Sequence, residues 1–338
     1  MSCTPFTAHR QRGVALMIVI FIFALVSILS VGIYNRQSLF VQLAGNMVAQ
    51  SQAYEYAVAS EAYGRRLLKA DWDDDKDKNE LYDDLEEIKS SLIVPVDEAF
   101  LEAQFNDVQG KLNINDLVLL GSGGSAGEGG GQPNQVMFDR FKRLFSSLSI
   151  EEAKVESLQD WIDSNQDPRD FSGAEDGEYL GLEQPYRTAG QPMAHVSELL
   201  LIQGMTQQDY EKLLPHVCTL PQGQAPINVN TATNEVLMSL SAGMNKGLVE
   251  RLIEARANEP WPDINAFKND PAMQGIQFDE QYLGVRSSFY EIATVITLGD
   301  HVERLVSLIY RNEGDGKMQT LSRDQSHKYL ITKEKITL

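Results

Sequence analysis

The chain has 338 residues, which is room for one large domain or two to three small ones. It carries 48 Asp and Glu against 29 Lys and Arg, a net charge of −19, so its surface repels nucleic-acid phosphates and anionic lipid headgroups. Its apolar fraction supports a globular core, while its two cysteines, Cys3 and Cys218, leave the redox compartment open.

The N-terminus combines a short basic leader, which ends at Gly13, with a long uncharged stretch. No charged residue lies between Val14 and Ile33. About 20 apolar residues suffice to cross a bilayer as a helix, whereas the apolar core of a secretory signal is usually about 7–15 residues. We therefore expect a retained single-pass membrane helix over residues 14–35, with the basic flank in the cytoplasm. The alternative is an ordinary signal peptide cut near Gly32.

The membrane stretch continues into a segment without strong helix breakers. Residues 37–69 are rich in Ala, Gln, Leu and Glu, and their apolar side chains approximate one helical face. The pattern predicts one helix from Val14 to about Lys69, on the order of 80 Å long. Two helices broken near Tyr34 are the alternative.

An acidic stretch, residues 71–87, follows this helix. Aspartates alternate from Asp73 as they do in a calcium-binding loop. However, Lys78 occupies the position that requires glycine, and Asp84 occupies the position of the bidentate glutamate. We therefore predict a solvated acidic loop here.

Alternating apolar residues predict an antiparallel sheet. Residues 99–115 are expected to form a hairpin that turns near Gly110. Three further strands are expected at 287–300, 301–313 and 326–335, which are rich in Val, Ile and Tyr.

A glycine-rich linker is predicted at residues 117–133. Its sequence GSGGSAG matches both a dinucleotide-binding fingerprint and a nucleophile elbow. Both motifs require a helix that begins at once, and the glycines and Pro133 that follow disfavour one.

Residues 134–286 are predicted to form an inserted, all-α domain. It contains two helix-hairpin-helix-like units, at 197–217 and 231–257. The flanking segments, 36–116 and 287–338, would then form one α+β domain, in which the long N-terminal helix packs on the sheet.

The sequence also bears on two other functions, DNA binding and catalysis. A membrane-anchored helix-hairpin-helix protein that binds DNA is the alternative reading, but its hairpin offers only Gly243, and Lys246 and Arg251 are outnumbered by acidic residues. No nucleic-acid partner is therefore expected. None of the five histidines has the spacing of a metal motif, so we expect no enzyme.

A basic leader, a glycine, an uncharged run and then a sheet together resemble the type IV pilin-like class. The resemblance implies that a prepilin peptidase removes residues 1–13 after Gly13 and methylates Val14. The class normally has glutamate at the fifth mature position, where this chain has Ile18. That glutamate pairs with a neighbouring subunit's N-terminal amine, and an unpaired buried charge costs several kcal/mol. Isoleucine therefore suits a subunit at the end of a filament.

Separate stretches are similar to the K-type minor pseudopilins of type II secretion systems, which also lack this glutamate and have a large helical insertion. The stretches are GKLNIN (110–115), DWID (160–163), GAEDGEY (173–179), PYRTAGQPM (185–193), SELLLIQGM (197–205) and INVNTAT (227–233). Val14, in place of an aromatic residue, and the glycine-rich segment 121–133 depart from the family pattern.

This resemblance implies a pilin-like α+β fold and a place at the tip of the periplasmic pseudopilus, where it supports filament initiation and protein export. It implies an anchor in the bacterial inner membrane with the C-terminal bulk in the periplasm. The implied partners are the I- and J-type minor pseudopilins and the prepilin peptidase, with the outer-membrane secretin as a further candidate.

An acidic cluster at residues 163–178 holds six carboxylates in sixteen residues, which repel one another. Pro168 and Ala174 stand where an EF-hand needs glycine and glutamate, so the cluster is no EF-hand. Ca²⁺ would offset the repulsion, and the resemblance also implies calcium in the helical domain. The expected ligands are Asp163, Asp167, Glu175 and Asp176, with Asp170 or Glu178 as substitutes. Solvated charge is the alternative.

Overall fold

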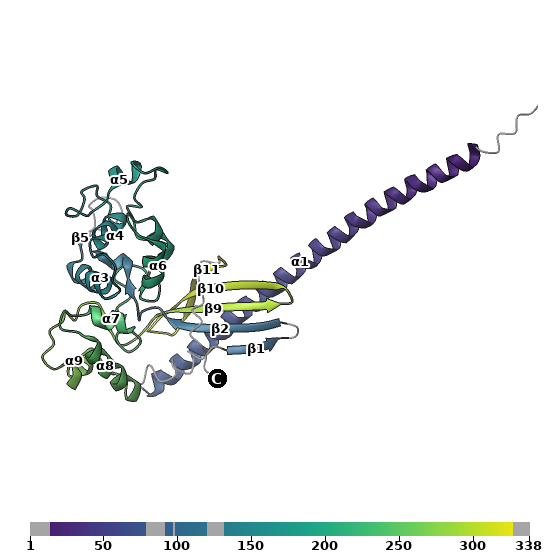
Figure 1. Cartoon of the computed structure of the whole chain (residues 1–338). Helices are drawn as coiled ribbons and strands as arrows, with labels where there is room; N and C mark the ends of the chain where they lie inside the picture. The colour runs from purple at the N-terminus through teal and green to yellow at the C-terminus, as the bar shows by residue number, and fades with distance from the viewer. Residues whose placement is uncertain (1–13, 79–91, 97–98, 120–131, 327–338) are drawn as a thin grey trace, which may run out of the picture.

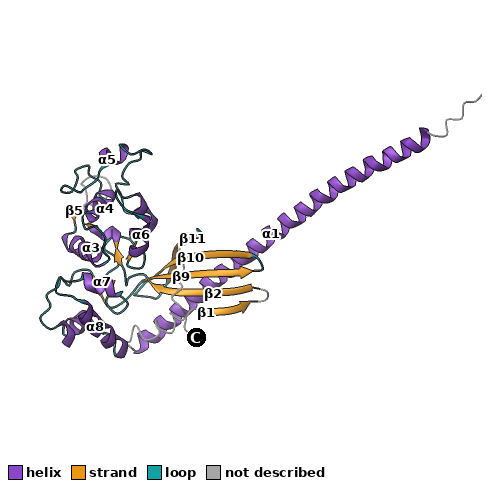
Figure 2. Cartoon of the chain, viewed as in Figure 1, coloured by secondary structure: helices purple, strands orange, loops and turns teal. Residues whose placement is uncertain are grey.

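The computed structural model describes residues 14–78, 92–96, 99–119 and 132–326. A long helix and a sheet form one part of the molecule, and a helical insertion forms the other (Figures 1 and 2). This is the predicted α+β architecture. The leader with Gly13, the centre of the glycine-rich segment and nearly all of the strand expected at 326–335 lie outside the described residues.

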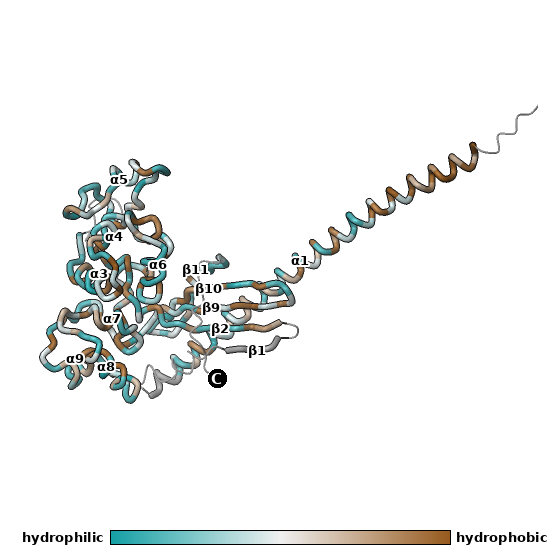
Figure 3. Tube along the Cα trace, viewed as in Figure 1, coloured by the Kyte–Doolittle hydropathy of each residue, from teal (hydrophilic) through white to brown (hydrophobic). Residues whose placement is uncertain are grey.

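Helix α1 (Val14–Lys78) runs for 65 residues without a break, so one helix rather than two is confirmed. At 1.5 Å per residue it is about 100 Å long. Its N-terminal half projects away from the rest of the molecule and forms a long hydrophobic arm (Figures 1 and 3). The large apolar side chains from Val14 to Val48 are exposed along this arm.

The acidic end of α1 differs from the predicted loop. Residues 71–78 are helical, while 79–87 lie outside the described range. Asp71 is buried, and its Oδ2 accepts a hydrogen bond from Nη1 of the buried Arg311 at 2.7 Å. The composition of the stretch indicated solvation, but the partner that buries Asp71 is 240 residues away in sequence.

The sheet has the strand order β1-β2-β9-β10-β11, and every neighbouring pair is antiparallel. Its strands are β1 (Leu92–Val96), β2 (Ala99–Asp107), β9 (Phe289–Leu298), β10 (His301–Arg311) and β11 (Met318–Asp324). The predictions at 287–300 and 301–313 are therefore confirmed, whereas β11 was not expected.

The hairpin expected over 99–115 is wrong. Strand β2 pairs with β1 and β9, while β3 (Leu112–Asn113) pairs in parallel with β6 (Val217–Cys218). The chain does turn near Gly110, but the turn directs it away from the sheet and into the insertion. Local alternation identifies a strand, yet it does not identify the partner of that strand.

Helix α1 covers one face of the sheet with small and apolar side chains. Ala53, Ala57 and Leu68 belong to the same buried cluster as Ile292 and Ile296 of β9. Alanines allow the helix to approach the strands closely, so the seam is tight over the C-terminal half of α1.

Glu61 lies in this seam and joins α1 to the last two strands. Its carboxylate accepts hydrogen bonds from Arg323 Nε at 2.6 Å, Thr320 Oγ1 at 2.7 Å and Ser307 Oγ at 2.8 Å. Burial alone raises the pKa of Glu61, but these three donors outweigh it and hold the pKa below its ordinary value.

The insertion leaves the sheet after β2 and returns at β9, its direct neighbour. Its helices are α3 (Gln135–Ser147), α4 (Lys154–Ile162), α5 (Asp176–Leu180), α6 (Gln207–Leu213), α7 (Asn234–Ser239), α8 (Lys246–Asn258) and α9 (Ile264–Lys268), with 3-10 turns η1 (Ile114–Leu117), η2 (Val196–Leu201) and η3 (Pro271–Met273). The remaining short strands are β4 (Val118–Leu119), β5 (Gln132–Pro133), β7 (Ile227–Asn228) and β8 (Leu283–Gly284).

The insertion has its own hydrophobic core. Leu112 and Ile114, which precede the predicted linker, and Leu117, its first residue, lie in that core together with Phe141 and Trp161. The elements η2 and α6 occupy the first predicted hairpin unit, and α7 and α8 occupy the second. Strands β4 and β5 pair with each other on either side of the glycine-rich segment.

Gly64 marks a close approach of α1 to the sheet. A Cβ at this position would overlap the ring of Phe105 and lie 2.7 Å from Ile292 Cδ1, and both side chains are buried. We expect Gly64→Ala to lower the free energy of unfolding by about 1–3 kcal/mol through overpacking, measured by guanidinium denaturation of the full chain in detergent.

Gly45→Ala is the matched control in the same helix, because a Cβ there would meet nothing within 4 Å. It should be neutral or stabilise by up to about 1 kcal/mol, since alanine is the better helix former. Equal losses at both positions would contradict a tight seam at Gly64.

Candidate functional site

The exposed arm of α1 has the length and composition of a membrane-spanning helix. Every large apolar side chain from Val14 to Ile33 is exposed, including Ile18, of which 53% is accessible. A surface of this kind is stable in lipid or against other apolar helices, and it is unfavourable in water. The arm is therefore a candidate site for both a bilayer and a helical bundle.

A second candidate site lies in the insertion, where the end of α4 meets the loop before α5. Asp160 and Asp163 stand about one helical turn apart near the end of α4, and both are buried. Asp160 accepts the backbone N–H of Arg169 with both oxygens, at 3.2 and 3.0 Å. Asp163 Oδ1 accepts the backbone N–H of Asn165 at 3.2 Å.

Glu175 completes a group of three buried acids. It immediately precedes α5, and both of its carboxylate oxygens are buried without a hydrogen-bond partner in the part of the chain that the structure describes. Burial, and then the nearby charges of Asp160, Asp163, Asp176 and Glu178, raise the pKa of Glu175 to about 8. Burial is likewise the main reason why the pKa values of Asp160 and Asp163 rise to about 6.

The four expected calcium ligands differ in burial and in hydrogen-bond partners. Asp163 and Glu175 are buried in the cluster, whereas Asp167 is exposed. Asp176 already has partners, because its Oδ1 accepts from Thr188 N at 3.0 Å and its Oδ2 pairs with Arg187 at 3.1 Å. Within the described ranges, no three His, Cys, Asp or Glu side chains are grouped as they would be around a bound metal ion.

Three further acidic residues belong to this region: Asp170 and Glu178, which were expected as substitute ligands, and Asp160, which was not expected. Asp170 is exposed, and Glu178 Oε2 accepts the backbone N–H of Glu175 at 2.9 Å. The fully buried Asp160 was not predicted. The sequence DWID contained a signal, because its two aspartates are three positions apart and a helix brings such residues to one face.

The second hairpin unit shows why a DNA-binding reading is not supported. The backbone N–H of Gly243 donates to Ser241 Oγ at 3.2 Å, and Ser241 Oγ donates to the carbonyl of Gln277 at 2.5 Å. Ile276 packs over Gly243, since a Cβ on this glycine would lie 3.2 Å from Ile276 Cδ1. The hairpin amide that would face a phosphate therefore already donates to a side chain within the protein, although Gly243 itself is exposed.

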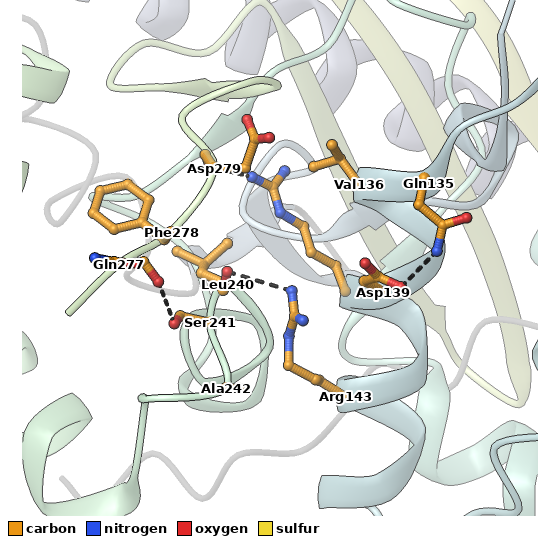
Figure 4. A pocket seen from close by; sticks show the side chains of 11 residues that line it. Gln135, Val136, Asp139, Arg143, Leu240, Ser241, Ala242, Gln277, Phe278 and Asp279 are labelled. Atoms are coloured by element: carbon orange, nitrogen blue, oxygen red, sulfur yellow. Dashed lines mark hydrogen bonds between the residues drawn. The ribbon is translucent and has the colours of Figure 1, made fainter.

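A cavity of about 470 Å³ lies beside this hairpin, between α3 and the loop that holds Phe278 and Asp279 (Figure 4). Arg143 reaches into it from α3, and its Nε donates to the carbonyl of Ser239 at 2.6 Å. The guanidinium also contacts the carbonyl of Leu240 at 3.4 Å, as Figure 4 shows. This cation thus fastens α3 to the end of α7.

Comparison with known families gives matches in the insertion. Two family models match the chain, one over residues 110–222 and one over residues 227–286, and both are described as type II secretion system protein K. The first match contains the buried acidic cluster, and the second contains the hairpin at Gly243.

Curated relatives cover almost the whole chain. The type II secretion system protein K of Pseudomonas aeruginosa is 32% identical, and the alignment covers 93% of this chain and 92% of that protein. The protein K of Aeromonas hydrophila is 30% identical, with 94% and 98% covered.

A solved structure supports the same relationship. The GspK-GspI-GspJ complex from the type 2 secretion system of enterotoxigenic Escherichia coli contains a chain that superimposes with a TM-score of 0.68 at 26% identity. The match covers 82% of this chain and 96% of that chain. The likeness thus extends from the sequence to the arrangement of helix, sheet and insertion, and the chain belongs to the type II secretion system protein K family.

Proposed function

We propose that this chain is the minor pseudopilin at the tip of the periplasmic pseudopilus, where it supports filament initiation and protein export across the outer membrane. The observation that carries the proposal is the position of the insertion. It lies at the end of the molecule opposite the apolar arm of α1 (Figure 1). Pilin-like subunits stack along their N-terminal helices, so a domain of this size above the sheet blocks the addition of another subunit.

The composition of the arm supports the same end position. A charged group in an apolar filament core costs several kcal/mol unless it is paired. Ile18, at the fifth position after Gly13, is apolar and needs no such partner, and no charged residue lies between Val14 and Ile33. The arm can therefore pack at the end of the apolar helical core of the filament without a charged partner from a neighbouring subunit.

The proposed partners are the I- and J-type minor pseudopilins, because the similar solved chain is part of a GspK-GspI-GspJ complex. The proposed location is the inner membrane, with the leader in the cytoplasm and the sheet and insertion in the periplasm. The basic leader before an apolar run supports this orientation. Prepilin peptidase is the proposed processing enzyme, and it would act at Gly13.

Processing and assembly test this function together. We expect the protein recovered from its native membrane to begin at a methylated Val14 and to co-purify with the I- and J-type subunits. Intact mass and N-terminal sequencing check the first point, and an affinity tag on the full chain checks the second. Gly13→Val should retain the leader, because a side chain at the cleavage position blocks the peptidase.

Gly32→Val is the control, since it changes a glycine within the same apolar run and a Cβ there would meet nothing within 4 Å. It should be processed normally. A mature chain that begins near residue 33 would identify an ordinary secreted protein and would overturn the tip proposal.

We also propose that the buried acidic cluster binds Ca²⁺. Glu175 fits the role of a calcium ligand, because its two buried carboxylate oxygens have no hydrogen-bond partner among the described residues. Asp160, Asp163 and Glu175 supply hard oxygen donors of the kind that Ca²⁺ prefers, and Asp167 and Asp176 are the next candidates. When bound, the cation would neutralise the clustered negative charge and fix the end of α4 to the start of α5.

The three raised pKa values set the direction of a pH effect in the metal-free protein. Aspartate and glutamate ordinarily ionise at 3.8 and 4.5, whereas Asp160 and Asp163 do so at about 6 and Glu175 at about 8 in the folded chain. The folded state therefore binds more protons between these limits, and its stability falls as the pH rises through about 6 and then about 8. Urea denaturation with a chelator should show this fall, and Glu175→Gln should remove its upper part. A stability curve for Glu175→Gln parallel to that of the wild type would contradict the assignment.

Calcium should reverse the loss at neutral pH. At saturating Ca²⁺ we expect the melting temperature of the full chain to rise and the pH dependence to flatten, because the ion binds the ionised carboxylates. Glu175→Gln should abolish the rise. Glu183→Gln, which changes an exposed acid a few residues beyond α5, should retain it. Identical calcium responses of these two variants would exclude Glu175 as a ligand.

A further inference from the structure

Phe171 is the most exposed large apolar side chain among the described residues. Its relative accessibility is 107%, and the next highest value, 74%, belongs to Phe23 in the membrane arm. An aromatic side chain carries a large apolar area, and covering it is favourable. Phe171 therefore differs from the partly exposed leucines that most protein surfaces contain.

The turn that carries Phe171 is fixed to the domain. The backbone N–H of Arg169 donates to the buried carboxylate of Asp160 at 3.0 Å, and the N–H of Gly173 donates to the carbonyl of Arg169 at 3.0 Å. Ser157 Oγ in α4 donates to the carbonyl of Ser172 at 2.7 Å. Backbone contacts on both sides of Phe171 thus hold the turn in place.

Side-chain contacts support the same conformation. The Arg169 guanidinium lies 3.8 Å from the centre of the Phe138 ring and bonds to the amide oxygens of Gln159 and Gln135. Asp170 adopts a left-handed backbone conformation, with φ of 52°, immediately before Phe171. The turn that presents the aromatic ring to solvent is therefore preorganised. Binding of a partner would cost little free energy for ordering this turn.

The exposed charges around Phe171 are negative. Asp167 and Asp170 are exposed and have no ion pair among the described residues, whereas the cation of Arg169 is stacked and hydrogen-bonded. A partner with lysine or arginine around an apolar pocket matches this arrangement in both shape and charge.

We propose that the turn around Phe171 is a docking surface for a periplasmic protein that presents an apolar pocket with a basic rim. This rests on the proposed tip position, because the loop beside α5 lies at the end of the insertion remote from the sheet (Figure 1). Phe171 fills the pocket, and the exposed Asp170 pairs with the rim. Aromatic residues are enriched at such interfaces.

Site-specific photocrosslinking tests the proposal in cells that contain the whole secretion system. Benzoylphenylalanine replaces Phe171 in the full chain, and the crosslinked peptide is sequenced by mass spectrometry. The control position is Phe100, a 64% exposed phenylalanine on β2. We expect a protein adduct specific to position 171 whose peptide contains apolar residues beside Lys or Arg.

Charge and function provide two further measurements. Asp170→Asn should reduce the adduct yield about threefold, because rim charges steer association. Asparagine tolerates the left-handed conformation at position 170. Phe171→Ser should reduce protein export about tenfold, the effect of losing one interface anchor, while Phe100→Ser should not.

The outcomes separate the two proposals. Phe171→Ser should still begin at Val14 and co-purify with the I- and J-type subunits, so unchanged assembly with reduced export supports docking. An adduct to an acidic peptide or to lipid, no adduct above the Phe100 control, or unchanged export would overturn the docking proposal. Failure of the wild-type chain to assemble would instead overturn the tip position.

Discussion

Gln109 and Asp107 join the two halves of the molecule at the point where the chain leaves the sheet. Gln109 Oε1 accepts the backbone N–H of Ser288 at 2.5 Å, and its Nε2 donates to the carbonyl of Pro226 at 2.8 Å. Asp107 Oδ2 accepts from Ser287 Oγ at 2.6 Å. Buried, satisfied networks of this kind fix the relative position of the segments that they connect. Because the exit and return strands are neighbours, an insertion with its own core is accommodated without opening the sheet.

Through this junction, the long helix α1 is mechanically connected to the insertion. The C-terminal half of α1 is fastened to the sheet by Glu61 and by the buried ion pair between Asp71 and Arg311. Arg311 lies in β10, and Tyr290, on the neighbouring strand β9, donates its hydroxyl to the carbonyl of Ser287 at 2.7 Å. Contacts therefore run from the C-terminal half of α1 through the sheet to the insertion. A push along α1 would reach the insertion through packed and hydrogen-bonded groups, which suits a subunit at the head of a growing filament.

The local pattern of apolar residues was sufficient to predict those helices and strands that a short segment of sequence specifies by itself. The apolar run gave the arm of α1, and strong alternation gave β9 and β10. It failed where the partner is distant in sequence, as for β3, which pairs with β6, and for Asp71, which Arg311 buries. Strand β11 was missed because five of its seven residues are polar or charged, as befits an edge strand, and only Met318 and Leu321 are apolar. In the acidic cluster, counting carboxylates located the loop, but only the fold shows that Asp160 faces it and that Asp176 has other partners.

The acidic cluster and the Phe171 turn share one residue, and this links the two surfaces physically. Asp160 lies in the buried acidic group and also accepts the N–H of Arg169, the residue at the start of the turn. Gly173, at its other end, packs against the same carboxylate so closely that a Cβ there would overlap it. A change that moves the Asp160 carboxylate must therefore move the backbone on both sides of Phe171. The fold thus places one buried carboxylate in contact with both the acidic cluster and the turn that presents the aromatic ring to solvent.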